Sequence, residues 1–521
     1  MATQSNVRPP LAGLGFYATV FCTGAAVMII ELLGTRLIAP FYGASLYVWS
    51  AQISVTMIAL ACGYYLGGWW ADRPGRAGLA LIVAIAGILT LLIPWLARPV
   101  LLATDDLGLR GGAFVSALAL FFPSLFFLGM VGPFAIKLGT ETLEGLGTRA
   151  GSIYAVSTLG SVIGTLVLGF YLFPRVGSRS ILLGLGWALL LLAMLVAFME
   201  GRARGRLRMS HAYVCLVCLC LAAVFTPMVV DAGSGSEQNS RFHVQAEQES
   251  LYGWVRVVDF ADQDIRTLMS DASTIGAATI KSGQNLLSYQ AIVDMLPAIQ
   301  PRIRKALLVG QGAGHMAMTL RSHYGIETDT LEIDPAVAEA ATRYFGFSPT
   351  GKAVVGDARY EMRRLSGPYD LIIMDCFTGG SEPSHLLTVE TLEHLRGMLS
   401  KDGILALNFV AFADQGHNPA LASVAKTLAQ VFGHQTVFVS EPGDDFNDFI
   451  FLASERPVDV SGSGLSTEQL AWLRQRAFQV DQGPGTVLTD DFNPLEHLQA
   501  RKSERYRETM VEWYGRDMLI R

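Results

Sequence analysis

The sequence ALLVGQGAG occupies residues 306–314 and joins a short apolar run to a glycine-rich turn. Four consecutive apolar residues next to a turn are typical of a strand that is buried on both faces. Because glycines carry no side chain, the backbone can approach a ligand here, and the helical pattern that follows places a helix N-terminus beside it. We therefore expect Gly310, Gly312, Ala313 and Gly314 to line a ligand site.

Three further strand-like runs follow, and each ends at or beside an acidic residue. They are 328–333 with Glu332, 353–355 with Asp357, and 369–374 with Asp375. Apolar strands that alternate with helical segments indicate a parallel, doubly wound sheet, and such sheets bind ligands beyond the carboxyl ends of their strands. The turn and the three acids are thus expected at one edge of a sheet.

Two of these acids are spaced to bind a nucleoside. Glu332 follows Gly310 by about 20 residues, the spacing at which a carboxylate meets the hydroxyl pair of a ribose. Asp357 is placed to accept a hydrogen bond from an adenine amino group. A glycine-rich turn alone is weak evidence, but together with Glu332, Asp357 and Asp375 it predicts a nucleoside site.

A small β-region is expected before this α/β domain. Residues 253–260 and 266–270 alternate apolar with polar residues, as half-buried strands do. The Gly/Ser-rich stretch 231–237 is typical of a flexible linker. We therefore divide the chain into an N-terminal domain at 1–231, a linker with a small β-domain at 232–300, and an α/β domain at 301–521.

The N-terminal part has a different composition. Of the 521 residues, 51% are hydrophobic and only 16% are charged, whereas soluble domains carry about 25% charged residues. Charged residues are concentrated after Val230, and the chain before it is largely apolar. The net charge of −6 offers no basic surface for phosphates, so a nucleic-acid partner is not expected. The composition predicts an integral membrane protein.

Seven apolar segments are long enough to cross a bilayer, which requires roughly 20 residues of helix. They are Leu14–Ile30, Leu46–Trp69, Leu79–Leu96, Ala113–Ile136, Ile153–Phe173, Ile181–Phe198 and Tyr213–Val230. We therefore expect an α-helical transmembrane bundle of about seven spans in a lipid bilayer. Small residues such as Gly160 and Gly164 would let neighbouring helices pack closely.

Residues 305–410, and more loosely the chain back to Glu249, resemble the spermidine synthase family of aminopropyltransferases. The matching motifs are Gly310–Gly314, Glu332-Ile333-Asp334, Gly356-Asp357-Ala358, Tyr369–Asp375 and Ser288-Tyr289-Gln290. The resemblance implies a Rossmann-like, methyltransferase-type fold. With its apolar part, the whole chain resembles the multi-pass membrane spermidine synthase-like proteins of bacteria.

By this resemblance, the protein transfers an aminopropyl group from decarboxylated S-adenosylmethionine to an amine and releases methylthioadenosine. Asp375 would be the catalytic base, because an amine with a pKa near 10 is mostly protonated at neutral pH. Gln290, Asp357 and Ala358 would contact the donor, and Tyr289 the acceptor. We expect a homodimer and no metal, since the pair Cys215 and Cys218 lies in an apolar segment without the electropositive surroundings of a reactive thiolate.

Three residues depart from the family pattern, and one of them is Gly253, where the family has a Gln near the start of the domain. The family carries an acid in the glycine turn that holds the amine end of the decarboxylated donor; this chain has Ala313, so undecarboxylated S-adenosylmethionine becomes a candidate donor. The family's acid for the acceptor diamine lies three residues after the catalytic aspartate, where this chain has Thr378. Candidate substitutes for that acid, any of which could instead cap a helix or stay solvated, are Glu382, Asp490, Asp491 and Glu496.

Three function classes stay open. The first is aminopropyl transfer to an amine by a membrane-anchored enzyme. The second is chemistry on undecarboxylated S-adenosylmethionine, by cyclisation to homoserine lactone and methylthioadenosine, by aminocarboxypropyl transfer or by methyl transfer. The third is a polyamine or nucleoside transporter or sensor, because residues 67–76 resemble a charged loop of major-facilitator transporters.

The location follows from the spans, but two arguments disagree on the orientation. We expect a multi-pass protein of the bacterial inner membrane. The supply of donor favours a cytoplasmic α/β domain. Lys and Arg are concentrated on the side of residues 202–208, however, and with seven spans the positive-inside rule places the α/β domain on the opposite face.

Overall fold

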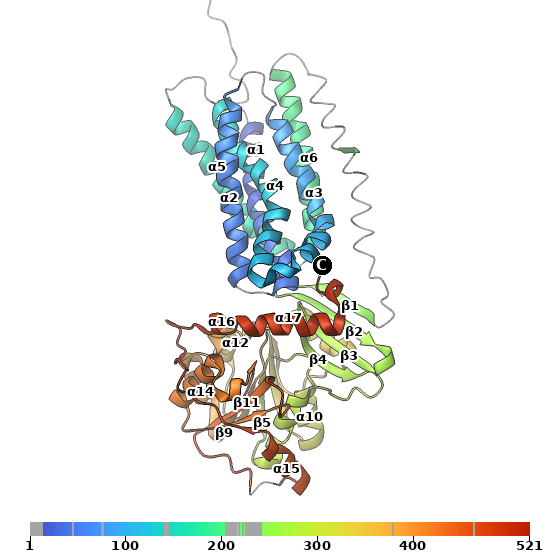
Figure 1. Ribbon diagram of the computed structural model, residues 1–521, viewed down its shortest axis with the longest axis vertical. Coiled ribbons are helices and arrows are strands. Elements are labelled where there is room, and N and C mark those ends of the chain that lie inside the picture. The colour runs from blue at the N-terminus through green and yellow to red at the C-terminus, as the bar shows by residue number, and fades with distance from the viewer. Residues whose placement is uncertain are drawn as a thin grey trace, which may run out of the picture. The chain divides into compact units, whose positions relative to one another are not determined.

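The computed structural model describes residues 14–43, 46–73, 78–139, 145–173, 175–203, 242–377, 380–461 and 464–520, with isolated residues between 216 and 223. The chain divides into two compact units. One contains residues 1–237 and 514–521, and the other contains residues 238–513. The first unit is helical and the second is built from strands and helices (Figure 1).

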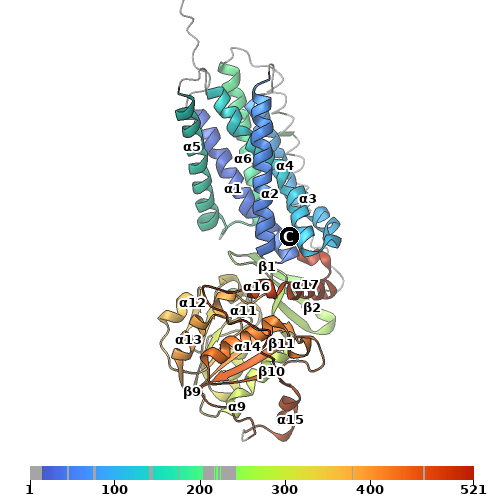
Figure 2. The same ribbon diagram turned by 60° about the vertical axis from the view of Figure 1, so that its left-hand side comes forward.

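Long helices that run side by side form the first unit (Figure 2). They are α1 Leu14–Tyr42, α2 Leu46–Ala71, α3 Leu79–Ala103, α4 Gly108–Gly139, α5 Leu146–Leu166 and α6 Ser178–Ala203. Six described helices are long and apolar enough to cross a membrane. They correspond to the first six predicted spans. Apart from isolated residues, the seventh, Tyr213–Val230, lies outside the described part of the chain, as do Cys215 and Cys218.

Helices α1 and α5 pack closely through small residues. A Cβ atom at Gly160 would overlap the carbonyl oxygen of Phe21, and one at Gly164 would lie 2.9 Å from the Cα of Ala25. Close backbone contact of this kind favours helix association in lipid, where apolar burial gives little drive. The predicted role of these glycines in packing is confirmed.

An antiparallel meander opens the second unit. Its strands are β1 His243–Glu249, β2 Trp254–Phe260, β3 Ile265–Ser270 and β4 Ser273–Thr279, in that order across the sheet. The predicted strands at 253–260 and 266–270 are β2 and β3. Val257 and Leu268 pack against Val337 of α11 (Pro335–Tyr344), so the meander has a buried face. The predicted boundaries at 231 and 300 remain predictions.

A larger, eight-stranded sheet follows. Its strands are β5 Lys305–Val309, β6 Glu327–Glu332, β7 Ala353–Val355, β8 Tyr369–Met374, β9 Leu399–Phe412, β10 His434–Val439, β11 Phe446–Ser454 and β12 Ala477–Phe478. Their order is β12-β10-β11-β9-β8-β5-β6-β7. The part from β7 to β9 is parallel, as predicted. Strands β11, β10 and β12 continue antiparallel, so the sheet is mixed.

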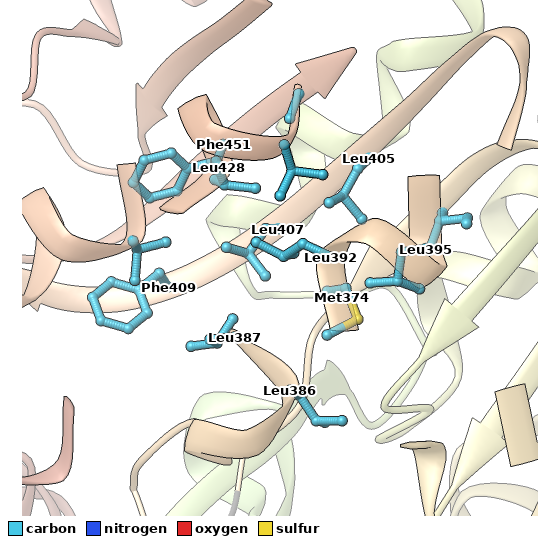
Figure 3. Packing of buried hydrophobic residues seen from close by; sticks show 14 of the residues in the cluster. Met374, Leu386, Leu387, Leu392, Leu395, Leu405, Leu407, Phe409, Leu428 and Phe451 are labelled. Carbon is cyan, nitrogen blue, oxygen red and sulfur yellow. The ribbon is translucent and has the colours of Figure 1, made fainter. Parts of the chain in front are cut away.

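Helices cover both faces of this sheet. Besides α11, the helices that follow the meander are α8 Ser288–Asp294, α9 Leu296–Ile299, α10 His315–Tyr324, α12 Ala358–Glu361, α13 Val389–Met398, α14 Pro419–Val431, α15 Thr467–Gln475, α16 Leu495–Leu498 and α17 Ala500–Tyr514. In β8, Met374 belongs to the same buried cluster as Leu392 of α13 and Leu428 of α14 (Figure 3). Ile373 packs on the other face with Leu320 of α10. Alternate side chains of one strand thus enter two cores, as a doubly wound sheet requires.

Candidate active site

The glycine-rich turn leads from β5 into α10. Gly310, Gly312 and Gly314 have φ values of 90°, 53° and 80°, which residues with a Cβ rarely adopt. A Cβ at Gly310 would overlap the carbonyl oxygen of Asp375, and one at Gly312 would lie 2.6 Å from the carbonyl oxygen of Ile275. The turn therefore runs directly against the backbone of β4 and of the segment after β8.

Glu332 is the last residue of β6 and is 8% exposed. Its Oε2 accepts a 3.2 Å hydrogen bond from the backbone N–H of Gly312, and its Oε1 accepts a 3.0 Å bond from the N–H of Asp334. Burial raises the pKa of Glu332 to about 7, although these backbone bonds lower it. The carboxylate is thus joined to the glycine turn.

Asp357 follows β7 as the N-cap of α12, and Ala358 is the first residue of that helix. Oδ1 of Asp357 accepts a 2.9 Å hydrogen bond from the N–H of Tyr360. The side chain is 46% exposed, and its Oδ2 lies 4.0 Å from Nε2 of His385. This carboxylate caps a helix and still has an accessible oxygen for a ligand.

The acids at the ends of β6, β7 and β8 all influence one residue, Cys376. Burial raises the pKa of the Cys376 thiol well above its ordinary value, and the charges of Glu332, Asp375 and Asp357 raise it further. The four strands β8, β5, β6 and β7 are parallel neighbours, with Met374 beside Val309 and Glu332 beside Val355, so their carboxyl ends lie at one edge of the sheet. The structure therefore brings together the three acids that the strand pattern placed at one edge.

Asp375 immediately follows β8, and each of its two carboxylate oxygens accepts a hydrogen bond. Its Oδ1 accepts a 2.9 Å hydrogen bond from Nδ2 of Asn408, and its Oδ2 accepts a 2.7 Å bond from the hydroxyl of Tyr289. Its N–H donates to the carbonyl oxygen of Val309 at 2.8 Å. Burial raises the pKa of Asp375 to about 6, although the bonds from Asn408 and Tyr289 lower it. A carboxylate with that pKa can accept a proton near neutral pH.

Helix α8 contributes Tyr289 and its neighbour Gln290. Nε2 of Gln290 donates a 3.3 Å hydrogen bond to the hydroxyl oxygen of Tyr289. Gln290 is 5% exposed, and its Oε1 has no hydrogen-bond partner within the described part of the chain. Burial raises the pKa of Tyr289 well above its ordinary value, and the charge of Asp375 adds to this effect. Tyr289 thus acts as a neutral hydrogen-bond donor at this site.

Two polar residues of this site were missed in the sequence. Asn408 lies in β9 and Asp448 in β11. Nδ2 of Asn408 bonds to Oδ1 of Asp375 at 2.9 Å and to Oδ1 of Asp448 at 3.3 Å. Burial raises the pKa of Asp448 to about 7, and the charge of Asp375 also raises it. The sequence does contain one signal for these two residues, because each is a polar residue within a largely apolar strand.

Glu382 is already engaged within the protein. Its Oε1 accepts a 2.7 Å hydrogen bond from the N–H of Val410; its Oε2 accepts bonds from Gln499 at 2.7 Å and from Nζ of Lys502 at 2.5 Å. The side chains of Glu382 and Lys502 are 3% and 2% exposed. This buried ion pair joins the loop after β8 to α17, and its charges lie beside Asp375 and Asp448.

The remaining predicted site residues form no hydrogen bond with Asp375 in the described part of the chain. Thr378 lies outside the described residues. Ala313 is 3% exposed, and a Cβ at Gly276 of β4 would lie 2.5 Å from its methyl carbon. Asp490 forms an ion pair with Arg359. Asp491 and Glu496 are exposed. Within the described ranges, no group of three or more His, Cys, Asp or Glu side chains is arranged to hold a metal ion.

Curated relatives of the chain are transferases. Over 174 residues it is 35% identical to a polyamine aminopropyltransferase of Vibrio vulnificus, covering 31% of this chain and 58% of that protein. Over 240 residues it is 30% identical to an N-terminal histidine N-methyltransferase of Emericella nidulans, covering 41% and 42%. Over 277 residues it is 24% identical to a probable polyamine aminopropyl transferase of Bifidobacterium longum, covering 48% and 61%.

The chain thus spans about half the length of the curated relatives that it matches. No family model matches it. Among solved structures, a probable spermidine synthase from Corynebacterium glutamicum has 22% sequence identity and a TM-score of 0.38, covering 50% of this chain and 93% of that chain. By sequence, the curated homologues of this chain are polyamine aminopropyltransferases and methyltransferases.

Proposed function

We propose that this protein is a membrane-integrated transferase that moves an aminopropyl-type group from a sulfonium donor to an amine and releases methylthioadenosine. The donor would be S-adenosylmethionine or its decarboxylated form. The observation that carries the proposal is the environment of Asp375, which follows β8 with its backbone against the glycine turn and has its carboxylate oriented by Tyr289 and Asn408. The sequence similarity to polyamine aminopropyltransferases supports it.

The chemistry requires little of the protein beyond alignment and a base. The nitrogen lone pair of the acceptor attacks the carbon next to the sulfonium; the carbon–sulfur bond breaks, and its electron pair neutralises the sulfur. The attacking amine must be unprotonated, and its excess proton passes to Asp375. Because the pKa of Asp375 is about 6, this group is mostly ionised at neutral pH and ready to accept it. Glu332 and the turn Gly310–Gly314 would hold the nucleoside.

Methyl transfer from S-adenosylmethionine is the second candidate. It is favoured by the similarity to a protein named N-terminal histidine N-methyltransferase. Ala313 also supports it, because no carboxylate at that point of the turn would repel the carboxylate of the undecarboxylated donor. The leaving group separates the two reactions, since methyl transfer yields S-adenosylhomocysteine and not methylthioadenosine.

One chromatographic experiment tests these reactions. The full chain, purified in detergent, is incubated with each donor, with and without 1,4-diaminobutane, and the nucleoside products are separated. We expect methylthioadenosine that depends on the amine and is lost in Asp375→Asn. S-adenosylhomocysteine would instead select methyl transfer. Amine-independent methylthioadenosine from S-adenosylmethionine would select cyclisation to homoserine lactone. No turnover of either donor would favour a transporter or sensor.

We also propose a multi-pass protein whose α/β unit faces the cytoplasm, where the donor is made. A membrane-impermeant thiol reagent should label Ser282→Cys, an exposed position in the turn after β4, only after cells are opened. The parent protein controls for its native cysteines. Labelling in intact cells would place this unit on the opposite face. Light scattering of the purified protein would test the proposed homodimer.

A further inference from the structure

A cavity of about 890 Å³ is lined by α8, α10, the turn after β4 and the end of α11. From α8 it is lined by Ser288, Ala291 and Asp294, which recur every three residues and so share one face of that helix. The face of α10 that lines it contains His315, Met318, Thr319, Ser322 and His323. Tyr289 is not part of the lining and bonds instead to Asp375. The cavity is therefore separate from the proposed active site.

Asp294 is the one acid among the described residues that line this cavity. Its Oδ1 is buried and has no hydrogen-bond partner in the described part of the chain. Burial raises the pKa of Asp294 to about 7. Arg266, the one Lys or Arg in the same lining, bonds to both carboxylate oxygens of Asp259 at 2.7 Å and so has its own counter-ion. A carboxylate that is held out of water without a cation favours a positively charged ligand.

His315 is a second polar group in the lining that lacks a partner. It is the first residue of α10 and is 5% exposed, and neither ring nitrogen has a hydrogen-bond partner among the described residues. Burial lowers the pKa of His315, so the ring is neutral, with one nitrogen as donor and the other as acceptor. A buried polar group without a partner is unfavourable. A ligand with a hydroxyl group, which both donates and accepts, would supply the missing bond.

The size and the apolar part of the lining indicate an organic molecule. Small-molecule sites have volumes of roughly 300–1,000 Å³, and this cavity lies within that range. Leu286, Met318 and Phe345 contribute apolar side chains to its wall. The ring of Phe345 also meets the ring of His315 edge to face, with the centroids 5.9 Å apart. An aromatic body would therefore have apolar contacts between the two polar positions.

We propose that this cavity is a second ligand site, which binds an organic cation through an ammonium group at Asp294, an aromatic body against Met318 and Phe345, and a hydroxyl group at His315. The inference goes beyond the proposed transferase function and does not depend on it. The occupant lies away from the groups around Asp375, so methylthioadenosine should not displace it.

Three probes with one scaffold test the site. They are 4-(2-aminoethyl)phenol, which has both polar groups, 4-ethylphenol, which lacks the ammonium group, and 2-phenylethylamine, which lacks the hydroxyl group. Calorimetry of the full chain in detergent, at about pH 8, keeps Asp294 ionised and both amines protonated. Loss of the ammonium group should weaken binding by about 10- to 100-fold, and loss of the hydroxyl group by about 2- to 10-fold.

Variants assign each preference to its residue. Asp294→Asn should remove the advantage of the ammonium group. His315→Phe keeps a ring beside Phe345 and should remove the advantage of the hydroxyl group, with 2-phenylethylamine bound as in the wild type. Asp262→Asn is the matched control, because Asp262 is an exposed acid outside the cavity. Thermal unfolding checks that each variant is folded.

Four results would overturn the inference. They are equal affinity for the charged and uncharged probes, unchanged binding in Asp294→Asn, displacement by methylthioadenosine, and no binding of any probe. Each leaves the transferase proposal intact, because that proposal is judged by its nucleoside products. If Asp294→Asn does not fold, Ser322→Trp takes its place: it fills the cavity from an exposed position on α10 and should abolish binding of the probes. Undiminished binding in that variant would equally overturn the site.

Discussion

The hydroxyl of Tyr289 donates a 2.7 Å hydrogen bond to Oδ2 of Asp375. The bond joins α8, which precedes the large sheet in the chain, to the end of β8 near its centre. It stabilises the ionised carboxylate, whereas burial of the same group favours the neutral form. The balance of these two effects sets the pH at which Asp375 can accept a proton.

Replacing Tyr289 with Phe should shift the pH dependence of the reaction. The hydrogen bond lowers the pKa of Asp375, so its loss raises that pKa above about 6. Because the ionised form is the base, the acidic limb of the kcat/KM profile should move to higher pH, and the rate near neutral pH should fall. Initial rates across the acidic range measure this effect. An acidic limb at the wild-type position would contradict control of Asp375 by Tyr289.

Asp375→Asn separates catalysis from binding. Loss of a general base should lower turnover by about 100- to 10,000-fold, whereas methylthioadenosine should bind with nearly wild-type affinity, as calorimetry would measure. Retained turnover would remove Asp375 as the base.

The same substitution should not destabilise the protein at neutral pH. Folding raises the pKa of Asp375 from 3.8 to about 6, so the folded state favours the protonated carboxyl and loses stability as the pH rises from the lower value through the higher one. Asn stays neutral at every pH. Thermal unfolding at neutral pH should therefore occur at the same temperature as in the wild type or at a higher one. A clearly lower unfolding temperature would contradict this sign.

The Glu382–Lys502 pair should be important as a pair and not for acceptor binding. Lys502→Met leaves the Glu382 carboxylate buried without its cation, which should cost roughly 3–5 kcal/mol of folding free energy. The double variant Glu382→Gln with Lys502→Met should recover much of that loss. Unfolding curves of the two single variants and the double variant give the coupling. If the folded double variant had a greatly increased KM for the acceptor, Glu382 would also have to contribute to acceptor binding.

The glycine turn can be tested at two positions with positive φ. Gly310→Ala places a methyl group against the carbonyl oxygen of Asp375, so the turn must move and methylthioadenosine binding should be lost. Gly325→Ala, at the other end of α10, has a φ of 68° but no atom within 4 Å of the added carbon. It should cost only the backbone strain, roughly 1–2 kcal/mol, and should leave binding intact. Equal effects on binding would argue against close contact at Gly310.

The glycine turn and the acids at the ends of β6, β7 and β8 could be predicted because their signals are local. Each acid lies within a few residues of its apolar strand, and parallel strands bring their ends together. Asn408 and Asp448 were missed because their roles depend on β9 pairing with β8 and on β11 pairing antiparallel to β9, and nothing within a strand specifies its partner. The ion pair between Glu382 and Lys502 joins residues 120 positions apart. A short sequence window cannot detect such a contact.

In the helical unit, the contribution of the close contact between α1 and α5 to stability can be tested. Gly160→Val would place side-chain atoms against the carbonyl oxygen of Phe21 and force the two helices apart. Because small residues at such contacts provide much of the packing energy in lipid, the detergent-solubilised protein should unfold at a lower temperature. Gly151→Val is the matched control, since this glycine lies in the same helix with no atom within 4 Å of the added carbon. Equal unfolding temperatures for the two variants would mean that α1 and α5 do not depend on this contact.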